Sequence, residues 1–154
     1  MMGGKKNKST VSFRLAGIVV GDWRQKGIVS SELEENEMVT YTTHPQFRLL
    51  AERREVMVLM RIRGVSSISE QEICHLEFST IFEISEGFNE IYNEETKKGE
   101  LGPDLSATLI GITYSTARGI IYERSKGTFL EYHLLPVVDP YRFVTPPADR
   151  SEEE

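Results

Sequence analysis

The sequence predicts an α+β fold: a four-stranded antiparallel sheet, then a short helix or loop, one long helix packed on the sheet, and an extended C-terminal segment. Two observations carry this prediction. Alternating apolar and polar residues dominate the first half of the chain, which is the pattern of strands, and one apolar segment of helix length follows. Several strands followed by a helix-rich end are typical of α+β folds, whereas α/β folds alternate strands with helices.

The first predicted strand covers residues 11–20. Its apolar residues alternate up to Leu15 and change phase at Ile18, so we expect a β-bulge near Gly17. The long connection that follows is acidic in its middle and is typical of a functional or mobile loop. The alternative is that it contains a short strand at 38–43, where β-forming residues gather.

Three further strands are predicted over residues 47–52, 55–63 and 73–85. The last is the clearest, because apolar side chains from Cys74 to Ile84 alternate with polar ones. Cys74 is the only cysteine, and its place in this alternation indicates a buried core thiol.

A polar segment that forms a short helix or loop leads to the long helix, for which we expect Asp104 as the N-cap. The helix has apolar residues on two opposite sides. One side holds Leu105, Leu109, Ile112 and Ile120, and the other holds Ala107, Ile110, Tyr114, Ala117 and Ile121. A helix of this kind is normally buried on both sides, so we expect one side on the chain's own sheet and the other on a partner subunit.

Three small residues spaced by four, Gly111, Ser115 and Gly119, line one stripe of this helix. Two glycines inside a helix cost about 1 kcal/mol each, and close packing against another element would offset that cost. The alternative is that the glycine content is accidental. The predicted subunit interface consists of Ile110, Gly111, Tyr114, Ser115, Ala117, Gly119 and Ile121.

Composition narrows the functional classes. The length of 154 residues suits one domain, which we expect over residues 10–144, with a flexible N-terminus at 1–9 and a disordered acidic tail at 145–154. The net charge of −6 disfavours nucleic-acid binding. No apolar run approaches the roughly 20 residues of a membrane span, and no signal peptide is recognised, so we expect a cytoplasmic protein without stable membrane insertion.

No motif for catalysis, cofactor binding or metal binding is recognised. The sequence has neither a glycine-rich phosphate loop nor a nucleophile elbow, and His44, His75 and His133 lack the spacing of metal ligands. We therefore predict no enzymatic activity, no cofactor and no metal. An enzyme centred on Cys74 and His75 is the weakest hypothesis, and it requires both side chains in one cleft.

Several segments resemble the SecB family of export chaperones. The strand EVMVLMRIRG is followed by ICHLEFSTIFEISEGF, then by Ala117-Arg118, by Gly127-Thr128-Phe129 and by Pro136-Val137, with six residues between Phe129 and Pro136. This resemblance spans residues 11–144. The sequence departs from the family pattern in four ways. It lacks the Cys-Pro at the start of the long helix and the Phe-Pro-Tyr motif. The gap between Ala-Arg and Gly-Thr-Phe is one residue shorter, and no helix is predicted after Phe143.

The resemblance implies paired subunits that assemble into a dimer or a tetramer, and a chaperone that binds unfolded or precursor polypeptides in apolar grooves without nucleotide. It also implies an export ATPase as a candidate partner. Our candidates for the groove are Trp23, Tyr92, Phe129, Leu134, Val137, Tyr141 and Phe143. The alternative is a dedicated SecB-like adaptor for a single partner, such as an antitoxin.

Overall fold

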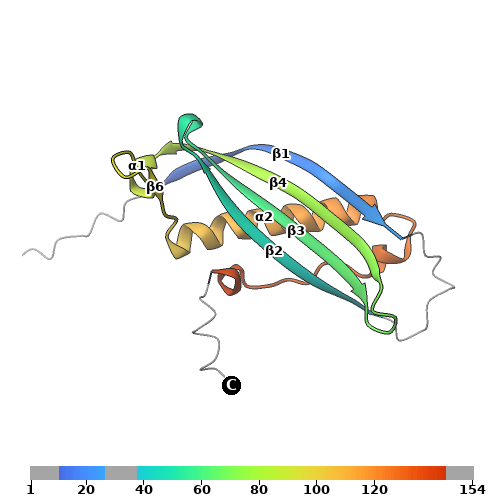
Figure 1. The fold of residues 1–154 in the computed structure, drawn as a ribbon. Helices are drawn as coiled ribbons and strands as arrows, with labels where there is room; N and C mark the ends of the chain where they lie inside the picture. The colour runs from blue at the N-terminus through green and yellow to red at the C-terminus, as the bar shows by residue number, and fades with distance from the viewer. Residues whose placement is uncertain (1–10, 27–37, 145–154) are drawn as a thin grey trace, which may run out of the picture.

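The computed structural model describes residues 11–26 and 38–144, so the predicted flexible N-terminus and the predicted disordered tail lie outside the described residues. Four long strands come first in the chain, and one long helix follows (Figure 1). They are β1 (Ser12–Gln25), β2 (Val39–Leu50), β3 (Glu55–Ser66), β4 (Glu72–Glu86) and α2 (Pro103–Arg124).

The four strands form one antiparallel sheet in the order β1-β4-β3-β2, and α2 runs across one face of it (Figure 1). The predicted sheet and long helix are thus confirmed. The two segments predicted at 38–43 and 47–52 are a single strand, β2, which continues through Pro45. A proline is tolerated there because β2 is an edge strand, whose backbone bonds only to β3.

Strand β1 is bulged and longer than predicted. The register with β4 shifts between Leu15 and Gly17, where the bulge was expected, and again between Val20 and Asp22. The second shift brings Trp23 opposite Leu76, so the strand continues to Gln25 instead of ending at residue 20. The sequence did not indicate this continuation, because Gly21 and Asp22 are of residue types that are common in loops.

Two apolar clusters hold α2 against the sheet. The first joins Met60, Ile62, Leu76 and Phe78 of the strands to Ile110, Tyr114, Ala117 and Ile121 of α2. The second joins the other end of the sheet, with Val56 and Phe82, to Leu109 of α2 and to Phe88. Between them Thr80 and Thr113 share a buried hydrogen bond of 2.6 Å, which satisfies both hydroxyl groups.

Short elements connect and follow these parts. They are the turn η2 (Ala51–Arg53), the helix α1 (Phe88–Ile91), the small hairpin β5 (Tyr92–Asn93) and β6 (Lys98–Gly99), and the 3-10 turns η3 (Phe129–Tyr132) and η4 (Pro140–Phe143). In the described part of the chain, no helix has the length and the hydropathy that a bilayer crossing requires.

The expected N-cap of α2 is wrong by two residues. Gly102 occupies the N-cap position and Pro103 the first position of the helix. Proline is favoured there because its fixed φ suits the helix and its missing N–H would have no partner in the helix. Asp104 lies in the first turn, where its carboxylate accepts a hydrogen bond of 2.6 Å from the hydroxyl of Tyr141.

Candidate functional site

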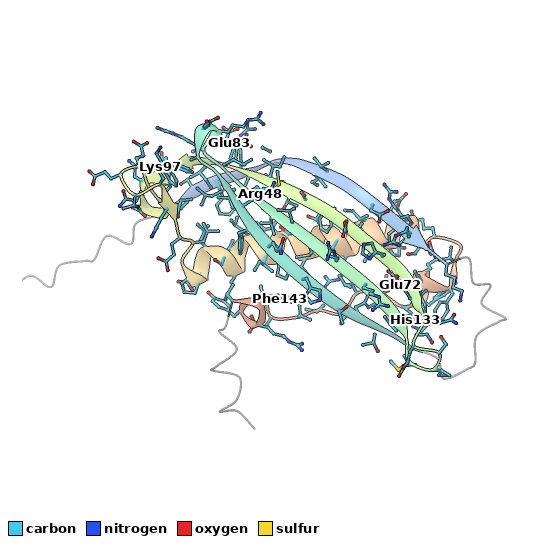
Figure 2. All side chains as sticks on the ribbon, viewed as in Figure 1. Arg48, Glu72, Glu83, Lys97, His133 and Phe143 are labelled. Carbon is cyan, nitrogen blue, oxygen red and sulfur yellow. The ribbon has the colours of Figure 1, made fainter. Side chains whose placement is uncertain are left out.

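The segment that follows α2 turns back and runs along the helix toward its beginning. Figure 2 labels His133 and Phe143 near the two ends of this returning segment, residues 133–143. Two side chains of α2 hold it. The Tyr114 hydroxyl donates to the carbonyl of Pro136 at 2.6 Å, and Arg118 donates to the carbonyls of Leu135 at 3.2 Å and Pro136 at 3.3 Å.

The sheet holds the start of the returning segment. The hydroxyl of Tyr41, on β2, donates to the carbonyl of His133 at 2.7 Å. Burial raises the pKa of this phenol, so it keeps its proton and remains a donor. The returning segment is therefore tied both to the helix and to an edge strand.

Gly111 sets how closely the returning segment approaches α2. A Cβ atom at this position would lie only 3.3 Å from Cγ of Pro140. The glycine was predicted to allow close approach of a partner subunit, and here it allows close approach of the chain's own C-terminal segment. Nothing lies within 4 Å of the Cβ position of Gly119, the other glycine of the stripe.

A groove remains between β2, α2 and the returning segment, and it consists of two adjoining cavities. One, of about 470 Å³, lies between β2 and the segment, and the other, of about 680 Å³, lies between α2 and the segment. Tyr114, Val138 and Phe143 line both. The first cavity also touches Tyr41 and Pro45, and the second touches Ile112 and Val137.

The groove is mainly apolar on the α2 side and mixed on the β2 side, where Thr42, Thr43 and His44 line it, and it has basic groups along it. Arg118 lines one cavity and Arg142 the other, and none of the described residues that line the two cavities is acidic. The chain as a whole carries a net charge of −6. The local charge of the groove is thus opposite to that of the molecule, so it suits a ligand that combines apolar groups with carboxylates.

The seven predicted client-binding residues fall into three groups. Val137 and Phe143 line the groove. Leu134 and Tyr141 are exposed on the returning segment. The structure does not bring the other three into the groove, because Phe129 is buried in the core and Trp23 and Tyr92 pack against core clusters.

Sequence reasoning missed Tyr41, Pro45, Tyr114 and Val138 as groove residues. Tyr41 and Pro45 belong to β2, which the sequence pattern does not show as one continuous strand. Tyr114 was assigned to the subunit interface. The signal in the sequence that could have indicated the groove is the spacing of Tyr41 and Pro45, which places both on one face of the edge strand β2.

The predicted subunit interface needs correction. Four of its residues, Ile110, Tyr114, Ala117 and Ile121, are at most 5% exposed and pack on the chain's own sheet. Both sides of α2 carry similar numbers of apolar residues, so the pattern did not show which side faces the sheet. Ser115 and Gly119 are exposed, and on the opposite apolar side Leu105, Ile112 and Ile120 are only partly buried.

The enzyme hypothesis required Cys74 and His75 in one cleft, and the structure contradicts it. Adjacent residues of a strand point to opposite faces. Cys74 is buried beside Gly64 and Tyr41 on the helix side, and burial raises the pKa of its thiol to about 11. The thiol is therefore protonated at neutral pH and makes a poor nucleophile.

No protein-family model matches this sequence. No curated protein matches it either. Among solved structures, the chain is similar to the Mycobacterium tuberculosis SecB-like chaperone Rv1957, which was solved in complex with a ChAD peptide from the Rv1956 HigA1 antitoxin. The two are 13% identical, and the match covers 82% of this chain and 90% of that one with a TM-score of 0.59. A protein of unknown function from Streptococcus agalactiae matches over 84% of this chain and 98% of its own length, at 11% identity and a TM-score of 0.47. This chain therefore shares its fold with a SecB-like chaperone.

Proposed function

We propose that this protein is a SecB-like molecular chaperone that holds an unfolded polypeptide in the groove between β2, α2 and the returning segment. The observation that carries the proposal is the pair of adjoining cavities, the larger of them mainly apolar, beside apolar side chains that remain exposed. Val137 is 85% exposed, and Leu134 and Tyr141 are nearly half exposed. Exposed apolar groups of this kind along a groove are typical of sites that bind another apolar chain.

Two kinds of interaction would hold an extended client. Burial of apolar surface contributes about 25 cal/mol per Å². In addition, β2 lies at the edge of the sheet, so one side of its backbone is unpaired within the sheet and can add hydrogen bonds to an extended chain. Neither interaction requires a nucleotide. The cytoplasmic location expected from the sequence is part of this proposal.

A direct test is to dilute a reduced, unfolded model protein into buffer with and without this protein. We expect suppression of light scattering at a stoichiometric ratio of the two chains. Unchanged aggregation at that ratio would count against the chaperone proposal.

A second candidate is a dedicated adaptor for a single partner, with an antitoxin as the example. It is favoured by the fact that the SecB-like chaperone of similar fold was solved with an antitoxin peptide. Pull-down from the native host separates the two candidates, since one stoichiometric partner supports the adaptor and many precursors support the general chaperone. Recovery of an ATPase together with precursors would extend the proposal to protein export.

The proposal includes self-association through the side of α2 that faces away from the sheet. Ser115 and Gly119 are exposed there, whereas Leu105, Ile112 and Ile120 are partly buried and also pack against the chain's own core clusters. Small residues on this side would let a second copy approach closely. A dimer or a tetramer built in this way would have closed symmetry.

A further inference from the structure

A buried histidine lies among three carboxylates on the face of the sheet opposite α2. The Nε2 atom of His75 lies 3.5 Å from Oε1 of Glu77 and 3.9 Å from Oδ2 of Asp22. Its Nδ1 atom lies 3.2 Å from Oε1 of Glu72. The side chain of His75 is 10% exposed, whereas those of Asp22 and Glu77 are 40% and 39% exposed.

The register of the sheet builds this cluster. Asp22 of β1 pairs with Glu77 of β4, and Arg24 pairs with His75, so these four residues share one face. The bulge between Val20 and Asp22 fixes that register. Asp22, His75 and Glu77 each offer one ligand atom, and these atoms all lie within 4.8 Å of one another.

The ring of His75 can present a ligand atom to the two carboxylates. Oε1 of Glu72 is buried and has no hydrogen-bond partner among the described residues, and the nearest ring atom of His75 is Nδ1. A neutral imidazole with its proton on Nδ1 presents a lone pair at Nε2. That lone pair then faces Oδ2 of Asp22 and Oε1 of Glu77, so three atoms that can ligate a cation point toward one another.

A divalent transition-metal ion fits this geometry. Ligand atoms about 2.0 to 2.1 Å from a tetrahedral Zn²⁺ ion lie about 3.3 Å from one another. The distances of 3.5 and 3.9 Å around Nε2 are about 0.2 and 0.6 Å longer than that value, so small side-chain rotations would bring the three atoms onto one ion. We propose that Asp22, His75 and Glu77 bind a divalent transition-metal ion, with Zn²⁺ the best match and water as the fourth ligand. With the ion bound, Glu72, whose Oε1 lies 3.2 Å from Nδ1, would orient His75 as outer carboxylates do in zinc sites.

Two arginines share these carboxylates. Arg24 Nε lies 3.1 Å from Oδ2 of Asp22, and Arg61 Nε lies 2.5 Å from Oε1 of Glu77. Both arginine side chains are more than 60% exposed, so these pairs contribute little and reorient at small cost. Each carboxylate also has about four lone-pair sites, so it can accept from an arginine and bind the ion together.

The ion would link the edge strand β1 to β4 on the face that α2 does not cover. The polypeptide groove lies on the helix side, so the two proposals rest on different residues. Failure of one leaves the other standing.

The test is calorimetric titration of the full-length protein, without a histidine tag and after chelator treatment, with ZnCl₂ at pH 7.5. We expect saturable binding of one ion per chain and a rise in Tm. The double variant Asp22→Asn, Glu77→Gln should lose both effects, and Glu72→Gln should weaken binding about ten- to a hundred-fold.

Glu83→Gln is the matched control. Glu83 lies on the same face of β4 and pairs with Arg14 at 2.7 Å, but it is outside the cluster, so this variant should bind Zn²⁺ as the wild type does. Circular dichroism of each variant without metal checks the fold. Absence of saturable binding by the wild type, or wild-type binding by the double variant, overturns the proposal.

Discussion

At the scale of single residues, the tightest place in the sheet is Gly64 on β3. A Cβ atom there would lie 2.7 Å from Sγ of Cys74, 3.0 Å from Cε1 of Tyr41 and 3.1 Å from Cγ1 of Val39. We expect Gly64→Ala to destabilise the fold by about 1 to 3 kcal/mol through overpacking. Urea unfolding measures the change.

Gly21→Ala is the control for that variant. Gly21 is also in a strand, but its Cβ position lies 3.5 Å from the nearest atom, the carbonyl oxygen of Glu77, which is an ordinary contact. We expect the free energy of unfolding to change little. Equal destabilisation by the two variants would contradict the packing account of Gly64.

Cys74 makes a prediction about pH. Burial raises the pKa of its thiol to about 11 in the folded state, above the value of about 8.5 in an unfolded chain. The unfolded chain therefore releases this proton first, so the stabilisation is complete below about pH 8.5 and is lost as pH rises toward 11. The loss amounts to about 2 to 3 kcal/mol.

The measurement is the free energy of unfolding from pH 7 to 10.5 for the wild type and for Cys74→Ala. Removal of the thiol lowers stability at every pH because a cavity forms. The fall between pH 8.5 and 10.5 should be steeper in the wild type than in the variant. Parallel curves for the two proteins would show that the pKa of the Cys74 thiol is not raised by folding.

At the scale of elements, α2 and the returning segment depend on each other. Tyr114→Phe removes the hydrogen bond to the carbonyl of Pro136 and keeps the ring in place. We expect a loss of about 1 kcal/mol and faster amide exchange at Val137 and Val138. Unchanged exchange at both amides would mean that this hydrogen bond does not hold the segment.

The elements themselves follow from periodicity, but their relations do not. Alternation in 73–85 and the apolar run after Asp104 were enough to predict β4 and α2. Pro45 divided β2 in the prediction because a proline interrupts most strands, and only the position of β2 at the sheet edge explains its presence there. The groove could not be predicted from the sequence, since it depends on the path of residues 133–143 along α2 and β2.

At the scale of the whole molecule, self-association tests the side of α2 that faces away from the sheet. Gly119→Arg places a large charged group where nothing within 4 Å opposes it in the single chain, and arginine favours helix more than glycine does. Light scattering after size exclusion should give a multiple of the chain mass of 17.6 kDa for the wild type and a smaller assembly for the variant.

Tyr132→Arg is the control, because Tyr132 is 82% exposed and lies outside α2. It should assemble as the wild type does. A wild type that stays a single chain at micromolar concentration would contradict the expected self-association.

Neither the net charge nor the spacing of residues in the sequence predicts which charged groups lie together in the folded molecule. The acidic composition gave no sign that Arg118 and Arg142 line the groove. Likewise, the spacing of His75 in the sequence gave no sign of its place between Asp22 and Glu77, since a bulged register brings these residues together. Both features depend on contacts between distant segments.

The central claim is that the groove beside the returning segment binds unfolded polypeptide. The most direct measurement is fluorescence anisotropy of a labelled, permanently unfolded chain titrated with wild-type protein, Val137→Asp and Tyr132→Asp. Val137 and Tyr132 are 85% and 82% exposed, and only Val137 lines the groove. Burial of a valine contributes about 1.5 kcal/mol, so Val137→Asp should weaken binding about ten-fold or more while Tyr132→Asp binds as the wild type does. Equal affinity of all three proteins, or no binding by the wild type, would contradict the account.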